Sequence, residues 1–145
     1  LRSRDHVDAL RDALVQGVID CIATDHAPHT WEEKDCDFDE AEFGLIGLET
    51  ALPALLTHLV QPGLVDLFTL WDRMSYSPAR LLGLKDHGLK VGNRADVIVV
   101  DYDLEKVVDP AKGQSLSTNT PFQGQKLKGW PVLTIANGEI VFTDL

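Results

Sequence analysis

Residues 24–29 place one carboxylate and two imidazoles in a short turn that proline stiffens (Thr24-Asp25-His26-Ala27-Pro28-His29). A carboxylate such as that of Asp25 can hold a divalent cation or act as a general base. It does both when it borders a metal-bound water, whose pKa the metal lowers toward about 7. His26 and His29 could bind a metal, donate hydrogen bonds to a substrate or serve the structure alone. A capped turn without chemistry explains the same spacing, so the cluster indicates a candidate site without naming a reaction.

A second candidate element is the run 43–50, in which two glycines precede a predicted helix (Phe43-Gly44-Leu45-Ile46-Gly47-Leu48-Glu49-Thr50). Glycine lets the backbone approach a ligand closely, and a helix N-terminus favours an anion. From the pattern alone, an ordinary turn and helix cap is the favoured interpretation. The acidic stretch before it, residues 31–42, is expected to be a solvated loop, or a lid if it lies beside a site.

The elements that must position these residues are those of an α/β protein. Residues 3–17 predict a capped helix, and residues 18–23 form a nearly continuous apolar run, typical of a strand covered on both faces of a parallel sheet. Candidate residues directly follow this strand, at the end where α/β proteins collect ligands and catalytic groups. Helices are expected over 48–60 and about 67–74, and a separate short helix over 77–83, begun by Ser77-Pro78 and ended by Gly83.

The last third of the sequence predicts a small β unit. β-Branched runs occupy residues 97–100, 106–108 and 132–136, and Asn137-Gly138 predicts a hairpin into residues 139–142. A buried parallel strand needs parallel neighbours, and the first 80 residues offer none, whereas a full (β/α)8 barrel takes about 250 residues. We therefore expect residues 1–84 to be the last strand and helices of such a barrel, and residues 85–145 to be a β appendage.

Composition excludes several classes of function. Among 145 residues there are 13 basic and 23 acidic side chains, a net charge of −10, which opposes binding to nucleic acid. No apolar run approaches the roughly 18 residues of a membrane span, and charged side chains near the start argue against a signal peptide. The two cysteines form no C-x-x-C pair, so we expect a reduced protein of the cytoplasm, without a nucleic-acid or membrane partner.

Five motifs, in order across almost the whole chain, resemble those of bacterial long-type dihydroorotases, zinc enzymes of the cyclic amidohydrolase superfamily. They are residues 23–30 (ATDHAPHT), 43–53 (FGLIGLETALP), 77–84 (SPARLLGL), 92–97 (GNRADV) and 119–124 (NTPFQG). Hydantoinases and allantoinases share parts of this set. The resemblance implies a (β/α)8 barrel with a β-sandwich built from both chain ends. This chain would be the C-terminal third, with the end of the barrel in residues 1–84 and part of the sandwich in residues 85–145.

The resemblance also implies roles for individual residues. Asp25 matches the strand-eight aspartate that touches the more buried zinc and shuttles a proton from the attacking oxygen to the leaving ring nitrogen. His29 matches the histidine that hydrogen-bonds the carboxylate of dihydroorotate. Phe43 and Gly44 match the pair whose backbone contacts the substrate ring, whereas His26 inherits no role.

The implied activity is the reversible cyclisation of N-carbamoyl-L-aspartate to dihydroorotate in pyrimidine biosynthesis. The family's other zinc ligands, and its substrate-binding arginine and asparagine, belong to earlier strands and do not occur here. Asp25 alone cannot retain zinc, so we expect the isolated chain to be inactive. It should also need the remainder of its barrel, or copies of itself in a homo-oligomer, to cover its apolar faces.

Two alternatives stay open. One is a non-catalytic dihydroorotase-like subunit that scaffolds aspartate transcarbamoylase, and the other is a hydantoinase or allantoinase. The presence of Asp25 and His29 favours an enzyme, and the loop 25–30 together with Phe43-Gly44 favours a dihydroorotase.

Overall fold

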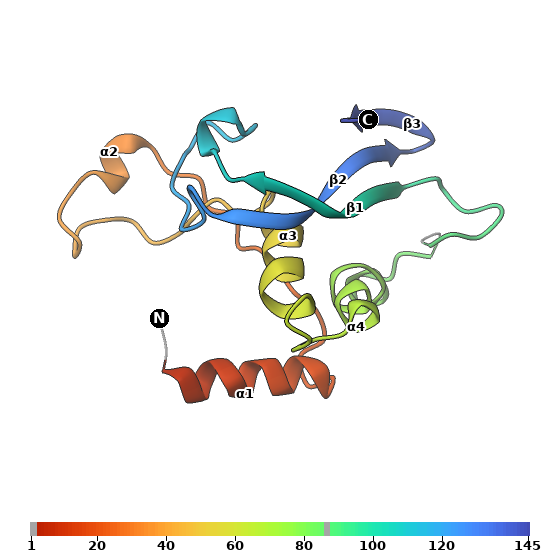
Figure 1. The fold of residues 1–145 in the computed structure, drawn as a ribbon. Coiled ribbons are helices and arrows are strands. Elements are labelled where there is room, and N and C mark those ends of the chain that lie inside the picture. The colour runs from red at the N-terminus through yellow and green to blue at the C-terminus, as the bar shows by residue number, and fades with distance from the viewer. Residues whose placement is uncertain (1–2, 86–87) are drawn as a thin grey trace.

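Helices occupy the first part of the chain and strands the last in the computed structural model, which describes residues 3–85 and 88–145 (Figure 1). The helices are α1 (Arg4–Val15), α2 (Trp31–Lys34), α3 (Ala51–Leu55), α4 (Leu67–Trp71) and α5 (Ser77–Leu81). Two π-helical segments, Leu56–Val60 and Asp72–Tyr76, and a 3₁₀ turn, Pro110–Lys112, add to them. The strands are β1 (Val97–Val107), β2 (Lys126–Ala136) and β3 (Glu139–Thr143). None of the described helices is long and apolar enough to cross a membrane.

The three strands form one antiparallel sheet in the order β1-β2-β3. The predicted hairpin is confirmed, because Asn137-Gly138 joins β2 to β3 and Ala136 pairs with Glu139. The two runs predicted as separate strands, 97–100 and 106–108, belong mainly to one strand, β1, which bulges after Asp101. The Asp101 side chain accepts hydrogen bonds from the backbone N–H groups of residues 103 and 104, and this closes the bulge locally.

A predicted helix over 48–60 is present from Ala51 to Val60, and its second half is π-helical. Pro53 is its third residue, where a missing backbone N–H costs nothing because first-turn N–H groups lack helical partners. The proposed separate helix beginning at Ser77 is wrong, since helical structure runs without a break from Leu67 to Leu81. Ser77 N donates to Asp72 O in a wide π turn directly before Pro78.

The predicted strand over residues 18–23 is also wrong for the chain as described. These residues form no strand, and Ile22 N donates instead to Arg73 O at 3.0 Å. A strand exists through hydrogen bonds to a neighbour, and the described residues supply none beside this run. The one pairing nearby is an isolated parallel bridge between His26 and Leu45.

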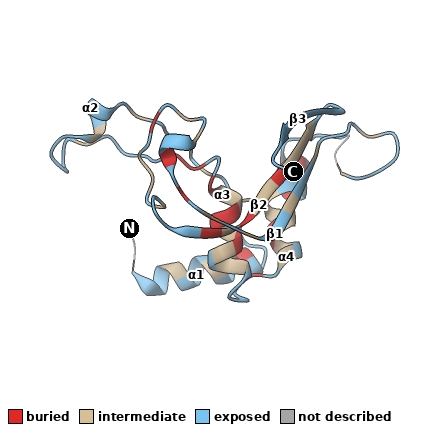
Figure 2. Cartoon of the chain, turned by 45° about the horizontal axis from the view of Figure 1, so that its top comes forward, coloured by how far each residue is buried: buried red, intermediate tan, exposed pale blue. Residues whose placement is uncertain are grey.

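The core lies where α3 and the π-helical segment after it meet β2 (Figure 2). Ala54, Val108 and Leu127 form its buried centre, with Phe122 and Trp130 packed against them. This core joins residues from both predicted parts of the chain, 1–84 and 85–145. The division into those two domains, and the barrel and sandwich they would belong to, stay predictions.

The helix approaches the sheet closely at one point. Thr57 Oγ1 accepts a hydrogen bond from Lys128 N at 2.8 Å. At the next residue, Gly129, an added Cβ would overlap Leu56 Cδ1 and lie 3.1 Å from Leu56 Cβ, at a φ of +85°. Glycine is therefore required here both by its backbone angle and by the side chain above it.

Candidate functional site

Two segments that the sequence analysis singled out separately, 24–30 and 43–50, lie side by side. His26 pairs with Leu45 in the parallel bridge, and Ala27 N donates to Leu45 O at 2.9 Å. The ring nitrogen Nδ1 of His26 accepts hydrogen bonds from Gly47 N at 3.0 Å and Leu48 N at 3.3 Å. His26, which inherited no role from the resemblance, therefore fastens one candidate segment to the other.

Asp25 stands directly before this bridge, and its side chain is exposed. Its backbone has a φ of 47°, a left-handed conformation that residues other than glycine, asparagine and aspartate rarely adopt. The turn thus holds the carboxylate at the end of the extended run, accessible to a solute. This position suits a group that exchanges protons with a substrate.

His29 is held from both sides of its ring. Nε2 lies 2.9 Å from Phe43 O, and Nδ1 lies 3.4 Å from Glu33 Oε2. Because a carbonyl oxygen can only accept, Nε2 carries a proton in this arrangement. A second proton on Nδ1 would point toward the Glu33 carboxylate.

Glu33 is fixed in turn by the start of α2. Thr30 N donates to Glu33 Oε2 at 2.8 Å and Glu33 N donates to Thr30 Oγ1 at 3.3 Å, which together make a capping box. The Thr30 backbone N–H, more than the nearby His29, lowers the pKa of Glu33 below its ordinary value. The predicted loop 31–42 therefore begins with a short capped helix, whose carboxylate faces His29.

Phe43 and Gly44 meet this histidine from the other candidate segment. The Phe43 side chain is 96% exposed, while its carbonyl is turned to the His29 ring. A Cβ on Gly44, whose φ is +129°, would lie 2.6 Å from Ala27 Cβ and 3.2 Å from His29 Nε2. The close approach of the loop 27–29 is thus sufficient reason for a glycine, with or without a bound substrate.

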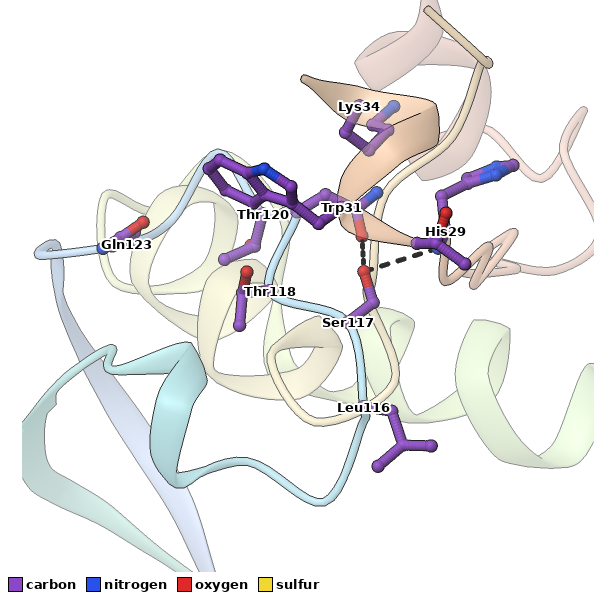
Figure 3. A pocket seen from close by; sticks show the side chains of 10 residues that line it. His29, Trp31, Lys34, Leu116, Ser117, Thr118, Thr120 and Gln123 are labelled. Carbon is purple, nitrogen blue, oxygen red and sulfur yellow. Dashed lines mark hydrogen bonds between the residues drawn. The ribbon is translucent and has the colours of Figure 1, made fainter. Parts of the chain in front are cut away.

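The last third of the chain also reaches the site, a contact that no pattern in the sequence predicts. Ser117 Oγ accepts from His29 N at 3.4 Å (Figure 3). Asn119 Nδ2 donates to Gly44 O at 3.0 Å. The motif 119–124 marked Asn119 as part of the resemblance but gave it no role. A cleft of about 330 Å³ lies between this segment and the start of α2. It is lined by His29, Thr30, Trp31, Lys34, Leu116, Ser117, Thr118, Asn119, Thr120 and Gln123.

The described residues do not form a complete metal site. Across residues 3–85 and 88–145, no three histidine, cysteine, aspartate or glutamate side chains come together in a way that could hold an ion. A catalytic zinc needs about three protein ligands. Asp25, exposed at the end of its run, could contribute one of them and does not suffice alone.

Comparisons with known proteins agree with the predicted class. The model of the amidohydrolase family matches residues 1–141. A dihydroorotase from Geobacillus sp. (strain WCH70) is 46% identical over 142 residues, which are 98% of this chain and 33% of that protein. A dihydroorotase from Pelotomaculum thermopropionicum is 47% identical over 144 residues, covering 99% of this chain and 34% of the relative.

Solved structures of related enzymes share the fold. An L-hydantoinase from Arthrobacter aurescens superposes with a TM-score of 0.91 at 36% identity, covering 98% of this chain and 33% of that one. A D-hydantoinase from Thermus sp. superposes with a TM-score of 0.89 at 28% identity, covering 99% of this chain and 32% of that one. The chain therefore spans about a third of the length of the proteins it matches. With its α/β class confirmed and its match running from residue 1 to residue 141, the chain belongs to the amidohydrolase family.

Proposed function

We propose that this chain supplies the Asp25–His29 side of a zinc-dependent dihydroorotase, which interconverts N-carbamoyl-L-aspartate and dihydroorotate in pyrimidine biosynthesis. The observation that carries the proposal is the contact between its two predicted substrate segments: the His29 ring lies 2.9 Å from Phe43 O. The dihydroorotase relatives, at 46–47% identity, support the choice of reaction.

Asp25 is the proton carrier in this proposal. In the hydrolytic direction, water oxygen adds to the ring carbonyl carbon, and the Asp25 carboxylate takes the proton that this oxygen releases. The carbon–nitrogen bond then breaks, and Asp25 returns the proton to the leaving nitrogen, so the carboxylate ends as it began. Zinc, when bound, supplies Lewis-acid activation. Asp25 would be its one ligand from this chain, and the others would come from elsewhere in the whole protein.

His29 and the backbone at Phe43-Gly44 bind the substrate in this proposal. The His29 ring is a donor whose current acceptor is Phe43 O, so a substrate carboxylate would replace or share that contact. The exposed position of residues 43 and 44 leaves room for the substrate ring beside the histidine.

A hydantoinase is the second candidate, because the L-hydantoinase is 36% identical to this chain. Both reactions open a cyclic amide, so Asp25 would keep its role and the ring would differ. The two candidates are separated by the substrate that the protein turns over.

The test is an assay of the full-length protein with dihydroorotate and with hydantoin, for the wild type and for Asp25→Asn. Asparagine keeps the size and accepts a φ of 47°, but it cannot take a proton, so dihydroorotate turnover should fall by about 100-fold or more. Asp39→Asn, on the exposed loop after α2, is the matched control and should keep wild-type turnover.

Each outcome has a distinct meaning. Near-normal turnover in a folded Asp25→Asn protein would remove Asp25 from the reaction. Hydantoin turnover without dihydroorotate turnover would favour the hydantoinase. Absence of both activities in the metal-loaded wild type would favour the non-catalytic subunit, whose test is association with aspartate transcarbamoylase.

A further inference from the structure

A segment from the last third of the chain, residues 114–119, is fastened across both candidate site segments. At one end the Glu49 carboxylate accepts from Gln114 N at 2.9 Å and from Ser115 N at 3.3 Å. At the other end Ile46 N donates to Asn119 O at 3.0 Å. These contacts place the backbone of residues 114–119 against the segment 43–50.

Between these ends, a side-chain relay connects His29 to Gly44. His29 N donates to Ser117 Oγ at 3.4 Å, and Ser117 Oγ donates to Asn119 Oδ1 (Figure 3). Asn119 Nδ2 then donates to Gly44 O at 3.0 Å. The two ends of the Asn119 amide are not interchangeable here, because Gly44 O can only accept a hydrogen bond.

The burial of Ser117 limits how freely the groups in this relay can move or change partners. Ser117 is 6% exposed, so its hydroxyl exchanges partners with water less readily than a surface group would. Gly44 O also accepts from Lys34 Nζ at 3.0 Å, but lysine has a long flexible side chain that comes from the same half of the chain. Asn119 has a short side chain on a segment already fixed at both ends, so it constrains Gly44 more tightly.

We propose that Asn119 is a positioning residue, which through Ser117 holds the His29 backbone and the Gly44 carbonyl at a fixed separation and so sets affinity for the substrate. This inference rests on the proposed function, in which His29 and Gly44 bind dihydroorotate. It assigns to residues 114–119 a part in substrate binding, although they need not touch the substrate.

The decisive variant is Asn119→Asp in the full-length, metal-loaded protein. Aspartate has nearly the same size and still accepts from Ser117, but it cannot donate to Gly44 O and sets a carboxylate against that carbonyl. We expect KM for dihydroorotate to rise about tenfold while kcat stays within about threefold, because binding groups shift and the proton carrier Asp25 does not. Asn137→Asp, the same substitution at an exposed position in the turn between β2 and β3, is the matched control and should change neither constant.

A second measurement on the same proteins is backbone hydrogen exchange. Asn119→Asp should speed exchange at Ile46 and Ala27, whose amides pair across the site, while exchange in β2 stays at wild-type rates. A role in stability alone would lower the active fraction, and so lower kcat at unchanged KM, which would overturn the proposal. Unchanged KM together with unchanged exchange would overturn it as well.

A failure of the proposed function can be distinguished from a failure of this inference, because the two depend on different measurements. If the wild type lacks dihydroorotate turnover, that function fails by itself, and the exchange rates at Ile46 and Ala27 still decide whether Asn119 positions the two segments.

Discussion

The strands β1, β2 and β3 pair with one another within the described chain, whereas the run of residues 18–25 that leads into the site has no strand beside it there. The pairing of β1 with β2 extends from Val97–Ile135 to Val107–Lys126 and is interrupted by the bulge after Asp101. In the run 18–25, by contrast, Ile22 N donates a hydrogen bond to Arg73 O, a carbonyl in a helical segment and not in a strand. The comparison shows that the sheet is organised by regular pairing, and the site by a few cross-links from its loops.

Burial is deepest where the helix after Thr50 meets β2, whereas apolar side chains of α1, of the run 18–25 and of β3 are exposed. Leu127 in β2 and Leu56 beneath it are fully buried, while Val18 is 72% exposed and Leu10 on α1 is 58% exposed. Apolar side chains of this size are normally covered in a folded protein, and covering them stabilises by about 25 cal/mol per Å². We expect the rest of the barrel, or further copies of the chain, to cover them.

The largest expected effect on stability lies in the sheet region. Gly129→Ala should lower the free energy of unfolding by about 3 kcal/mol, because the new Cβ overlaps Leu56 and the backbone has a positive φ. Urea unfolding of the full-length protein measures this. Gly124→Ala is the matched control, since Gly124 has a φ of +75° but nothing within 4 Å of an added Cβ. Its expected cost is about 1 kcal/mol, and equal losses in the two variants would show that the contact with Leu56 does not matter.

A smaller effect, on binding alone, is expected in the site region. His29→Ala removes a donor proposed to meet the substrate carboxylate, and a charge-assisted hydrogen bond is worth about 1.5–3 kcal/mol. KM for dihydroorotate should therefore rise about tenfold to a hundredfold. Steady-state kinetics with His6→Ala, an exposed histidine on α1, provides the control. An unchanged KM in His29→Ala would reject the role of His29 in substrate binding.

How far the sequence predicts each region depends on the range of the interactions involved. The β2–β3 hairpin could be predicted because the Asn137-Gly138 turn and the adjoining β-branched residues are local signals. The run 18–23 has the composition of a strand, but a strand needs a neighbour, and no local signal supplies one. Ser77-Pro78 has the composition of a helix start, yet the wide turn at Asp72 lets the helix continue through it.

The site divides in the same way. The polar residues after an apolar run pointed to Asp25 and His29, and their proximity to Phe43 and Gly44 is what the structure adds. The roles of these four residues in catalysis and binding stay predictions. Ser117 and Asn119 could not be connected to the site from sequence, because their bonds to His29 and Gly44 span 88 and 75 residues. A shared motif marks such positions without stating what they contact.

The contrast between the two regions is tested most directly by backbone hydrogen exchange on the 145-residue chain, under conditions where light scattering shows a single species. The β2 amides that bond to β1 between Leu127 and Leu133 should exchange at least about 100-fold more slowly than those of Cys21, Ala23 and Thr24. Ile22, which donates to Arg73 O, should fall between the two groups. Strong protection throughout residues 18–23 in a monomer would contradict the account, because it would mean that this run is already paired within the chain.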